Sequence, residues 1–163
     1  MRVSALMDYT KIQQDIIKDT ISGGKYFSLG HTHNGWIGVN FNNNVILLMP
    51  KQMCFIDIEA VNEANKFITL QESFFKGYYD AANMSDPIEL TSELYVVPGV
   101  KKPLTIFVNK NGEKIYVNTA YLDIFKTGVN ISYKGTDYKS PVYIYSSDDL
   151  IGFILPVNVR SRR

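Results

Sequence analysis

The start of the chain carries apolar residues at helical spacing. Isoleucine recurs at positions 12, 16, 17 and 21, which places these side chains on one face of a helix. Thr10 and Gln13 have the spacing of a capping box, and Gly23-Gly24 supplies the conformation that ends many helices. The pattern therefore predicts a helix over residues 10–22, after a short strand over residues 3–6.

Runs of β-branched and aromatic residues follow this helix, with turn-forming residues between them. Asn34-Gly35 and Asn42-Asn43-Asn44 are typical of tight turns, because Asn and Gly tolerate a positive φ. Pro50 ends the third run, since proline cannot donate to a ladder. The predicted strands cover residues 25–29, 36–41, 45–49 and 52–58.

Aromatic residues at helical spacing mark the middle of the chain. Phe74, Phe75, Tyr78 and Tyr79 recur with the period of a helix, which we expect over residues 70–83. Four aromatic side chains so close together cover a wide arc of the helix. We therefore expect some of them to stay exposed and to form a partner interface.

The last third of the chain repeats the alternation of strands and a helix. Asn111-Gly112 predicts a hairpin turn, and Asn118 and Gly128 are typical of the start and the end of a helix. The predicted helix covers residues 119–127, and the predicted strands cover residues 104–108, 114–117, 129–133, 142–145 and 151–155.

The two ends of the chain have the same predicted order of elements. Each has a helix and then three strands, and in each the last strand ends in proline, at Pro50 and Pro156. This order predicts an α+β fold of two similar halves, each a helix with an antiparallel sheet. A chance match is the alternative, because strands often end at proline.

Composition narrows the class of protein. Of the 163 residues, 45% are hydrophobic and 20% charged, which is typical of a folded globular chain. The net charge is +1, and without the three terminal arginines it would be 1 − 3 = −2. So balanced a chain does not bind nucleic acid through bulk charge alone.

The single cysteine and the lack of long apolar runs predict the cellular compartment in which the protein is located. One cysteine, Cys54, allows no internal disulfide and fits a reducing environment. No signal-peptide pattern follows Met1, and no apolar run approaches the ~20 residues of a membrane span. We expect a cytoplasmic protein without a membrane partner.

The C-terminal third resembles a known family. Residues 114–126 read KIYVNTAYLDIFK, a strand that runs into a short helix with the pattern V-N-x-x-Y-L. Residues 129–133, 140–144 and 152–157 continue the series in order, and the last reads GFILPV. This series is similar to the last domain of bacterial DNA polymerase sliding clamps.

The resemblance implies a non-enzymatic, clamp-like domain of two pseudo-symmetric helix-plus-antiparallel-sheet halves, linked to DNA replication. In that family a hydrophobic groove binds a short peptide of a partner protein, and its C-terminal wall falls here on Leu155, Pro156 and Val157. The family's helices line a channel around DNA, so cationic residues of the helices and the tail are candidate DNA contacts: Lys11, Lys18, Lys126, Arg160, Arg162 and Arg163. The resemblance implies no cofactor.

The chain departs from the family pattern in several ways. Bacterial clamps carry three such domains, whereas residues 1–163 predict one, so a ring would require a homo-oligomer. Asn158 replaces the family's terminal arginine, and residues 60–102 are an insertion that carries the aromatic helix. A second hypothesis is therefore an interaction or inhibitor protein of a phage or mobile element, which acts on a host protein through Phe74, Phe75, Tyr78 and Tyr79.

The two histidines give a third hypothesis. His31 and His33 alternate, so on a strand their side chains would point to the same side and could ligate one metal ion. A metal-dependent hydrolase would need a further ligand, such as Asp57 or Glu59. Asn34-Gly35 favours a surface turn instead, and we predict no metal site.

Overall fold

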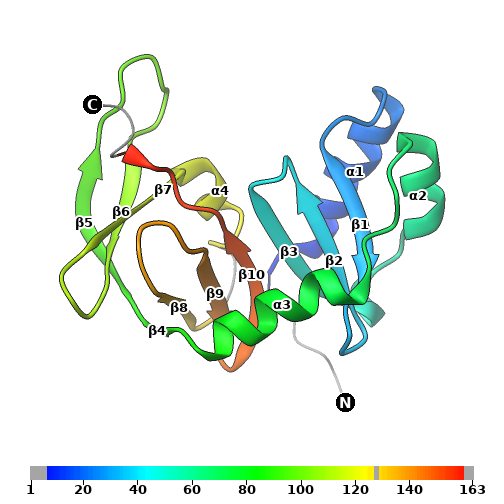
Figure 1. Ribbon diagram of the computed structural model, residues 1–163. Coiled ribbons are helices and arrows are strands. Elements are labelled where there is room, and N and C mark those ends of the chain that lie inside the picture. The colour runs from blue at the N-terminus through cyan, green and yellow to red at the C-terminus, as the bar shows by residue number, and fades with distance from the viewer. Residues whose placement is uncertain (1–6, 127–128, 160–163) are drawn as a thin grey trace. The chain divides into compact units, whose positions relative to one another are not determined.

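The computed structural model describes residues 7–126 and 129–159. The chain has an α+β fold of two compact units, residues 1–81 and 82–163 (Figure 1). The predicted first helix is present. In the first unit, α1 (Tyr9–Ile21) ends where Gly23 and Gly24 adopt positive φ, as predicted. The predicted capping box is wrong, because the Asp8 side chain accepts the bond from the Lys11 amide at 3.1 Å.

The buried face of α1 also differs from the expected row of isoleucines. Ile12 and Ile16 are buried, whereas Ile17 and Ile21 are 39% and 81% exposed. Gln13 is fully buried instead, because its side chain donates to the Met53 carbonyl at 3.0 Å and accepts from the Phe55 amide at 2.7 Å. A polar side chain occupies the core here because its bonding groups are satisfied.

The three strands after α1 form an antiparallel meander. They are β1 (Phe27–His31), β2 (Trp36–Phe41) and β3 (Val45–Pro50), close to the predicted bounds. Asn42 and Asn43 adopt positive φ in the turn from β2 to β3, as their residue types predict.

The fourth predicted strand, over residues 52–58, is wrong. The chain forms a short 3-10 turn, η1 (Lys51–Met53), and then the helix α2 (Ile58–Asn65). Asp57 caps α2 by accepting from the Ala60 amide at 3.1 Å. The buried positions of α2 are Ile58, Asn62 and Asn65, so two of the three are polar and the apolar pattern does not reveal the helix.

Two glycines let the third helix approach the meander. Gly30 and Gly38 pair across β1 and β2, and a Cβ on Gly38 would lie 2.2 Å from the Phe75 ring. The Leu70 carbonyl fills the corresponding space at Gly30. Phe75 belongs to α3 (Glu72–Asn83), which matches the predicted helix and continues into the second unit.

The second unit contains two groups of antiparallel strands. In the first group, β5 (Glu89–Tyr95), β6 (Leu104–Val108) and β7 (Lys114–Val117) are neighbours in that order. The hairpin of β6 and β7 has the predicted bounds. Sequence analysis did not predict β5, whose pattern is interrupted by a bulge between Leu90 and Leu94.

The second group follows the predicted short helix. Asn118 caps α4 (Thr119–Asp123), as predicted, although α4 is shorter than expected and Gly128 lies outside the described residues. After it, β8 (Ile131–Gly135), β9 (Val142–Ser146) and β10 (Asp149–Ile154) form a meander, and the short β4 (Asp86–Pro87) pairs with β8. The predicted strand over 3–6 lies outside the described residues.

The helices are short. The longest described helix, α1, has 13 residues, whereas a helical span of a bilayer needs about 20. Among residues 7–126 and 129–159, no helix combines the length and the apolarity that crossing a membrane requires.

Candidate partner-binding surface

The C-terminal segment predicted as a peptide wall lies beside β7. After β10, the Val157 amide donates to the Tyr116 carbonyl of β7 at 2.8 Å. Leu155, Pro156 and Val157 are all partly exposed. The three residues therefore line the outer edge of the three-stranded sheet, where they remain accessible to a partner.

Two tyrosines extend this surface across the sheet. The rings of Tyr95 on β5 and Tyr116 on β7 meet edge to face, with centroids 5.3 Å apart. Their partners on β6, Leu104 and Ile106, have the same parity, so both rings lie on one face of the sheet. Tyr95 is 37% exposed. Sequence analysis missed both tyrosines, because their contact depends on the register of three strands.

The loop from β5 to β6 adds exposed apolar side chains next to Tyr95. Val96 is 73% exposed and Val100 is 50% exposed. We call these two valines, with Tyr95, Tyr116 and residues 155–157, the loop-end surface. Its members come from three separate stretches of the sequence.

Two lysines at the end of this loop have different surroundings. Lys102 donates to Asp123 of α4 at 2.7 Å. Hydrogen bonds from Lys102 and Lys126 hold the pKa of the Asp123 carboxyl below its ordinary value. Lys101 is exposed, and within the described part of the chain it has no carboxylate partner. Lys101 directly follows Val100 of the loop-end surface in the chain.

The candidate DNA contacts on the helices are largely balanced by acidic neighbours. Lys11 lies 3.4 Å from Asp15, and Lys126 lies 2.8 Å from Asp123. Lys18 has no ion-pair partner among the described residues. The helix α1 carries two lysines and two aspartates, so its formal charge is zero. The tail residues Arg160, Arg162 and Arg163 lie outside the described residues.

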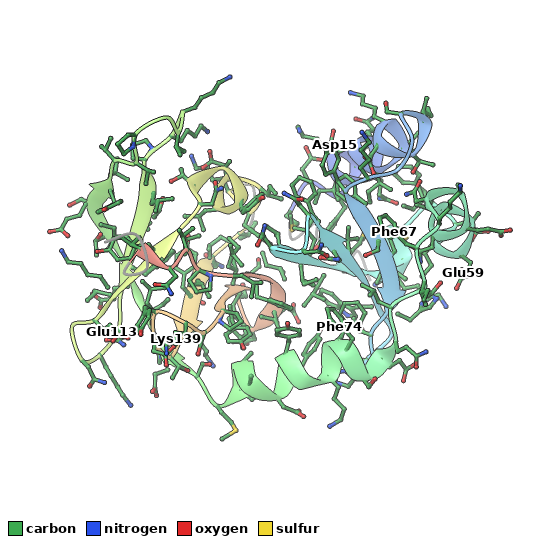
Figure 2. The ribbon with its side chains drawn as sticks, turned by 45° about the horizontal axis from the view of Figure 1, so that its top comes forward. Asp15, Glu59, Phe67, Phe74, Glu113 and Lys139 are labelled. Carbon is green, nitrogen blue, oxygen red and sulfur yellow. The ribbon has the colours of Figure 1, made fainter. Side chains whose placement is uncertain are left out.

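The aromatic residues of α3 divide between core and surface. Phe75 is fully buried, so this candidate interface residue belongs to the core. The Phe74 side chain, labelled in Figure 2, is 39% exposed. Its ring centroid lies 5.5 Å from that of Tyr78. The ring of Tyr79 meets that of His33 at 4.8 Å, and its hydroxyl accepts from Asn34 at 3.4 Å.

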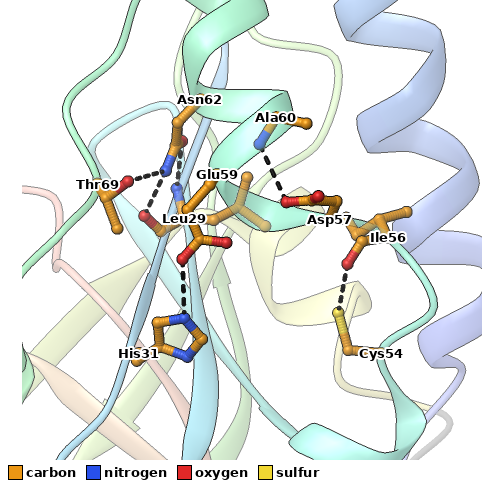
Figure 3. Close-up of polar contacts among 9 residues, drawn as sticks. All are labelled: Leu29, His31, Cys54, Ile56, Asp57, Glu59, Ala60, Asn62 and Thr69. Carbon is orange, nitrogen blue, oxygen red and sulfur yellow. Dashed lines mark hydrogen bonds and ion pairs between the residues drawn. The ribbon is translucent and has the colours of Figure 1, made fainter.

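The two histidines have separate partners. The His31 Nε2 lies 3.1 Å from the Glu59 Oε1 at the start of α2 (Figure 3), whereas the His33 ring packs on Tyr79. Among the residues that the structure describes, no group of three or more His, Cys, Asp or Glu side chains could hold a metal ion. Cys54 is partly buried, which raises the pKa of its thiol.

Asn62 fixes α2 against β1. Its side chain accepts from the Leu29 amide at 3.0 Å and donates to the Leu29 carbonyl at 2.8 Å (Figure 3). A third bond, 3.2 Å long, joins it to the Thr69 hydroxyl. The buried amide therefore holds the helix, the strand and the segment before α3 together.

Comparison with known proteins identified no relative. No protein-family model, no curated protein sequence and no solved structure matches this chain.

Proposed function

We propose that this chain is a non-catalytic, partner-binding protein with a clamp-like domain, which acts in or near DNA replication. In this proposal the two compact units correspond to the two pseudo-symmetric halves of one domain. The loop-end surface binds a short segment of a partner protein. The observation that carries the proposal is the accessible C-terminal segment, residues 155–157, bonded to β7 through Val157 and Tyr116.

Support for the clamp-like arrangement comes from the order of elements in each unit. In the first unit, α1 leads into the meander β1–β2–β3. In the second, α4 leads into the meander β8–β9–β10. Two helix-plus-meander series in one chain are what an internal repeat of this type requires.

Charge favours a protein partner over DNA. Lys11 and Lys126 already lie beside carboxylates, and α1 has no net charge. A cation that keeps its carboxylate partner contributes little to binding phosphate. We therefore expect DNA to bind weakly, mainly through Lys18 and the arginine tail, and to dissociate as salt concentration rises.

Three measurements on the purified chain test this function. Sedimentation gives the oligomeric state, a labelled duplex measures retention of DNA, and a display library of short random peptides measures peptide binding. We expect enrichment of apolar peptides, and weaker binding of them by the Val157→Asp variant. A monomer that retains neither DNA nor any peptide would refute the proposal.

The exposed side of α3 supports a second candidate function. Phe74 and Tyr78 form an aromatic pair that is open to solvent on Phe74, and such residues often anchor protein interfaces. The chain would then be an interaction or inhibitor protein of a phage or mobile element. Capture of a host protein by the native chain and its loss with Phe74→Asp would support this function. Phe75→Asp is unsuitable as a test, because Phe75 is a core residue.

A further inference from the structure

The region that departs most from the resemblance, residues 60–102, reaches the proposed peptide site. It contains β5, Tyr95 and both exposed valines of the loop. Tyr95 contacts Tyr116, and Tyr116 accepts the hydrogen bond from Val157. Through Tyr116, these two contacts link β5 of the insertion to the C-terminal segment.

We propose that the insertion supplies the second side of the peptide site, and that the partner segment is apolar with an acidic residue. This inference rests on the proposed function and names its partner. The apolar side chains of the segment contact Val96, Val100 and the exposed part of Tyr95. Its carboxylate binds the Lys101 ammonium.

Two adjacent lysines of the loop differ in their surroundings. Lys102 is held by Asp123 at 2.7 Å, and Asp123 also binds Lys126 at 2.8 Å. Lys101 is exposed, directly follows Val100 in the loop and has no carboxylate partner among the described residues. A ligand carboxylate there gains an ion pair without breaking an existing one.

The same charge argues against a second copy of the chain as the occupant. In a symmetric dimer through the loop-end surface, this surface of one copy would contact the same surface of the other. The loop-end surface contains no acidic residue, so the same surface of a second copy would offer Lys101 no carboxylate. A partner segment with an acidic residue supplies that carboxylate.

The test uses the most enriched peptide from the display selection, labelled and titrated against variants of the full chain. We expect this peptide to contain an acidic residue among apolar ones. Val96→Asp and Lys101→Glu should each weaken the binding of this peptide about tenfold, which corresponds to about 1.4 kcal/mol. Replacing the acidic residue of the peptide with lysine should restore binding to Lys101→Glu.

Two substitutions serve as matched controls. Val129→Asp changes a valine that is 54% exposed elsewhere in the second unit, and Lys25→Glu reverses an exposed lysine of the first unit. Both should bind the peptide like the native chain. Far-UV circular dichroism checks that Val96→Asp folds, which we expect because Val96 is 73% exposed.

The outcomes separate this inference from the function on which it rests. If Val157→Asp weakens the peptide while Val96→Asp and Lys101→Glu do not, the insertion has no part in the site and only the inference fails. Enriched peptides without an acidic residue would refute the charge argument. A dimer that Val96→Asp dissociates would make a second copy the occupant and overturn the proposal.

Discussion

Removing the Asn62 amide should destabilise the first unit strongly. Asn62→Ala deletes two hydrogen bonds to Leu29 and one to Thr69. The Leu29 carbonyl keeps the bond from the Leu70 amide at 2.9 Å, but the Leu29 amide loses the acceptor supplied by Asn62. A net loss of about 1 kcal/mol for each of the two bonds to Leu29, and a further 1–3 kcal/mol for a buried amide without a partner, predicts about 3–5 kcal/mol.

Asn62→Asp tests the same network through charge. One carboxylate oxygen can still accept from the Leu29 amide, but the other replaces a donor that faces the Leu29 carbonyl. Burial should raise the pKa of this new carboxyl above the unfolded value of about 3.9. Its ionisation then opposes folding, so the deficit relative to the native chain should grow as pH rises from about 4 through the raised pKa.

The only tryptophan of the chain provides the assay. Trp36 belongs to β2, so its fluorescence during urea unfolding reports on the first unit. Hydrogen exchange of the Leu29 amide measures the local effect directly. Asn44→Asp is the control, because it makes the same chemical change at an exposed residue of a turn.

Two results would contradict the reasoning. A loss below about 1 kcal/mol for Asn62→Ala would mean that its bonds to Leu29 contribute no more than one ordinary hydrogen bond. Unchanged protection of the Leu29 amide in Asn62→Ala would mean that this amide has another acceptor.

Further predictions concern three other contacts. Gly38→Ala should destabilise the first unit by about 1–3 kcal/mol, because the new methyl group would lie 2.2 Å from the Phe75 ring. In urea unfolding, the double variant Gly38→Ala, Phe75→Leu should recover part of the stability that Gly38→Ala loses. Gln13→Leu should lower the free energy of unfolding by about 1–3 kcal/mol, because it leaves the Phe55 amide without its 2.7 Å acceptor. A smaller loss of stability than in Gln14→Leu, the same change at an exposed residue of α1, would contradict this prediction. Asp123 has a lowered pKa, so its contribution is full above about pH 4 and is lost as pH falls through the lowered value; the melting temperature of Asp123→Asn should therefore depend less on pH in this acidic range.

The sequence predicted those elements whose own residues determine them. Asn42 and Asn43 adopt the positive φ that their turn requires, and Asn118 caps α4 as its residue type indicates. By contrast, α2 was missed because Asn62 and Asn65 take buried positions that are usually apolar. The Asn62 side chain bonds Leu29 and the Asn65 side-chain nitrogen donates to Thr20, and no local pattern contains partners so distant in the sequence.

The candidate surface was predictable only in part. Residues 155–157 follow from the family resemblance, and the structure places them at an accessible edge of the sheet. The contact of Tyr95 with Tyr116 requires the register of β5, β6 and β7, and the sequence did not predict β5. Asp123 binds Lys102, whereas Lys101 has no carboxylate partner in the described part of the chain, and this difference depends on three-dimensional position.

The bonds of Asn62 also determine how the first unit meets other chains. β1 is the outermost strand of its meander, and a bare outer strand is a template on which foreign strands assemble into fibres. At Leu29 the backbone of this outer strand is already bonded: its amide and carbonyl to the Asn62 side chain, and its carbonyl also to the Leu70 amide. The helix α2 thus blocks the outer strand of the sheet, so we expect truncation of α2 to make the protein aggregate.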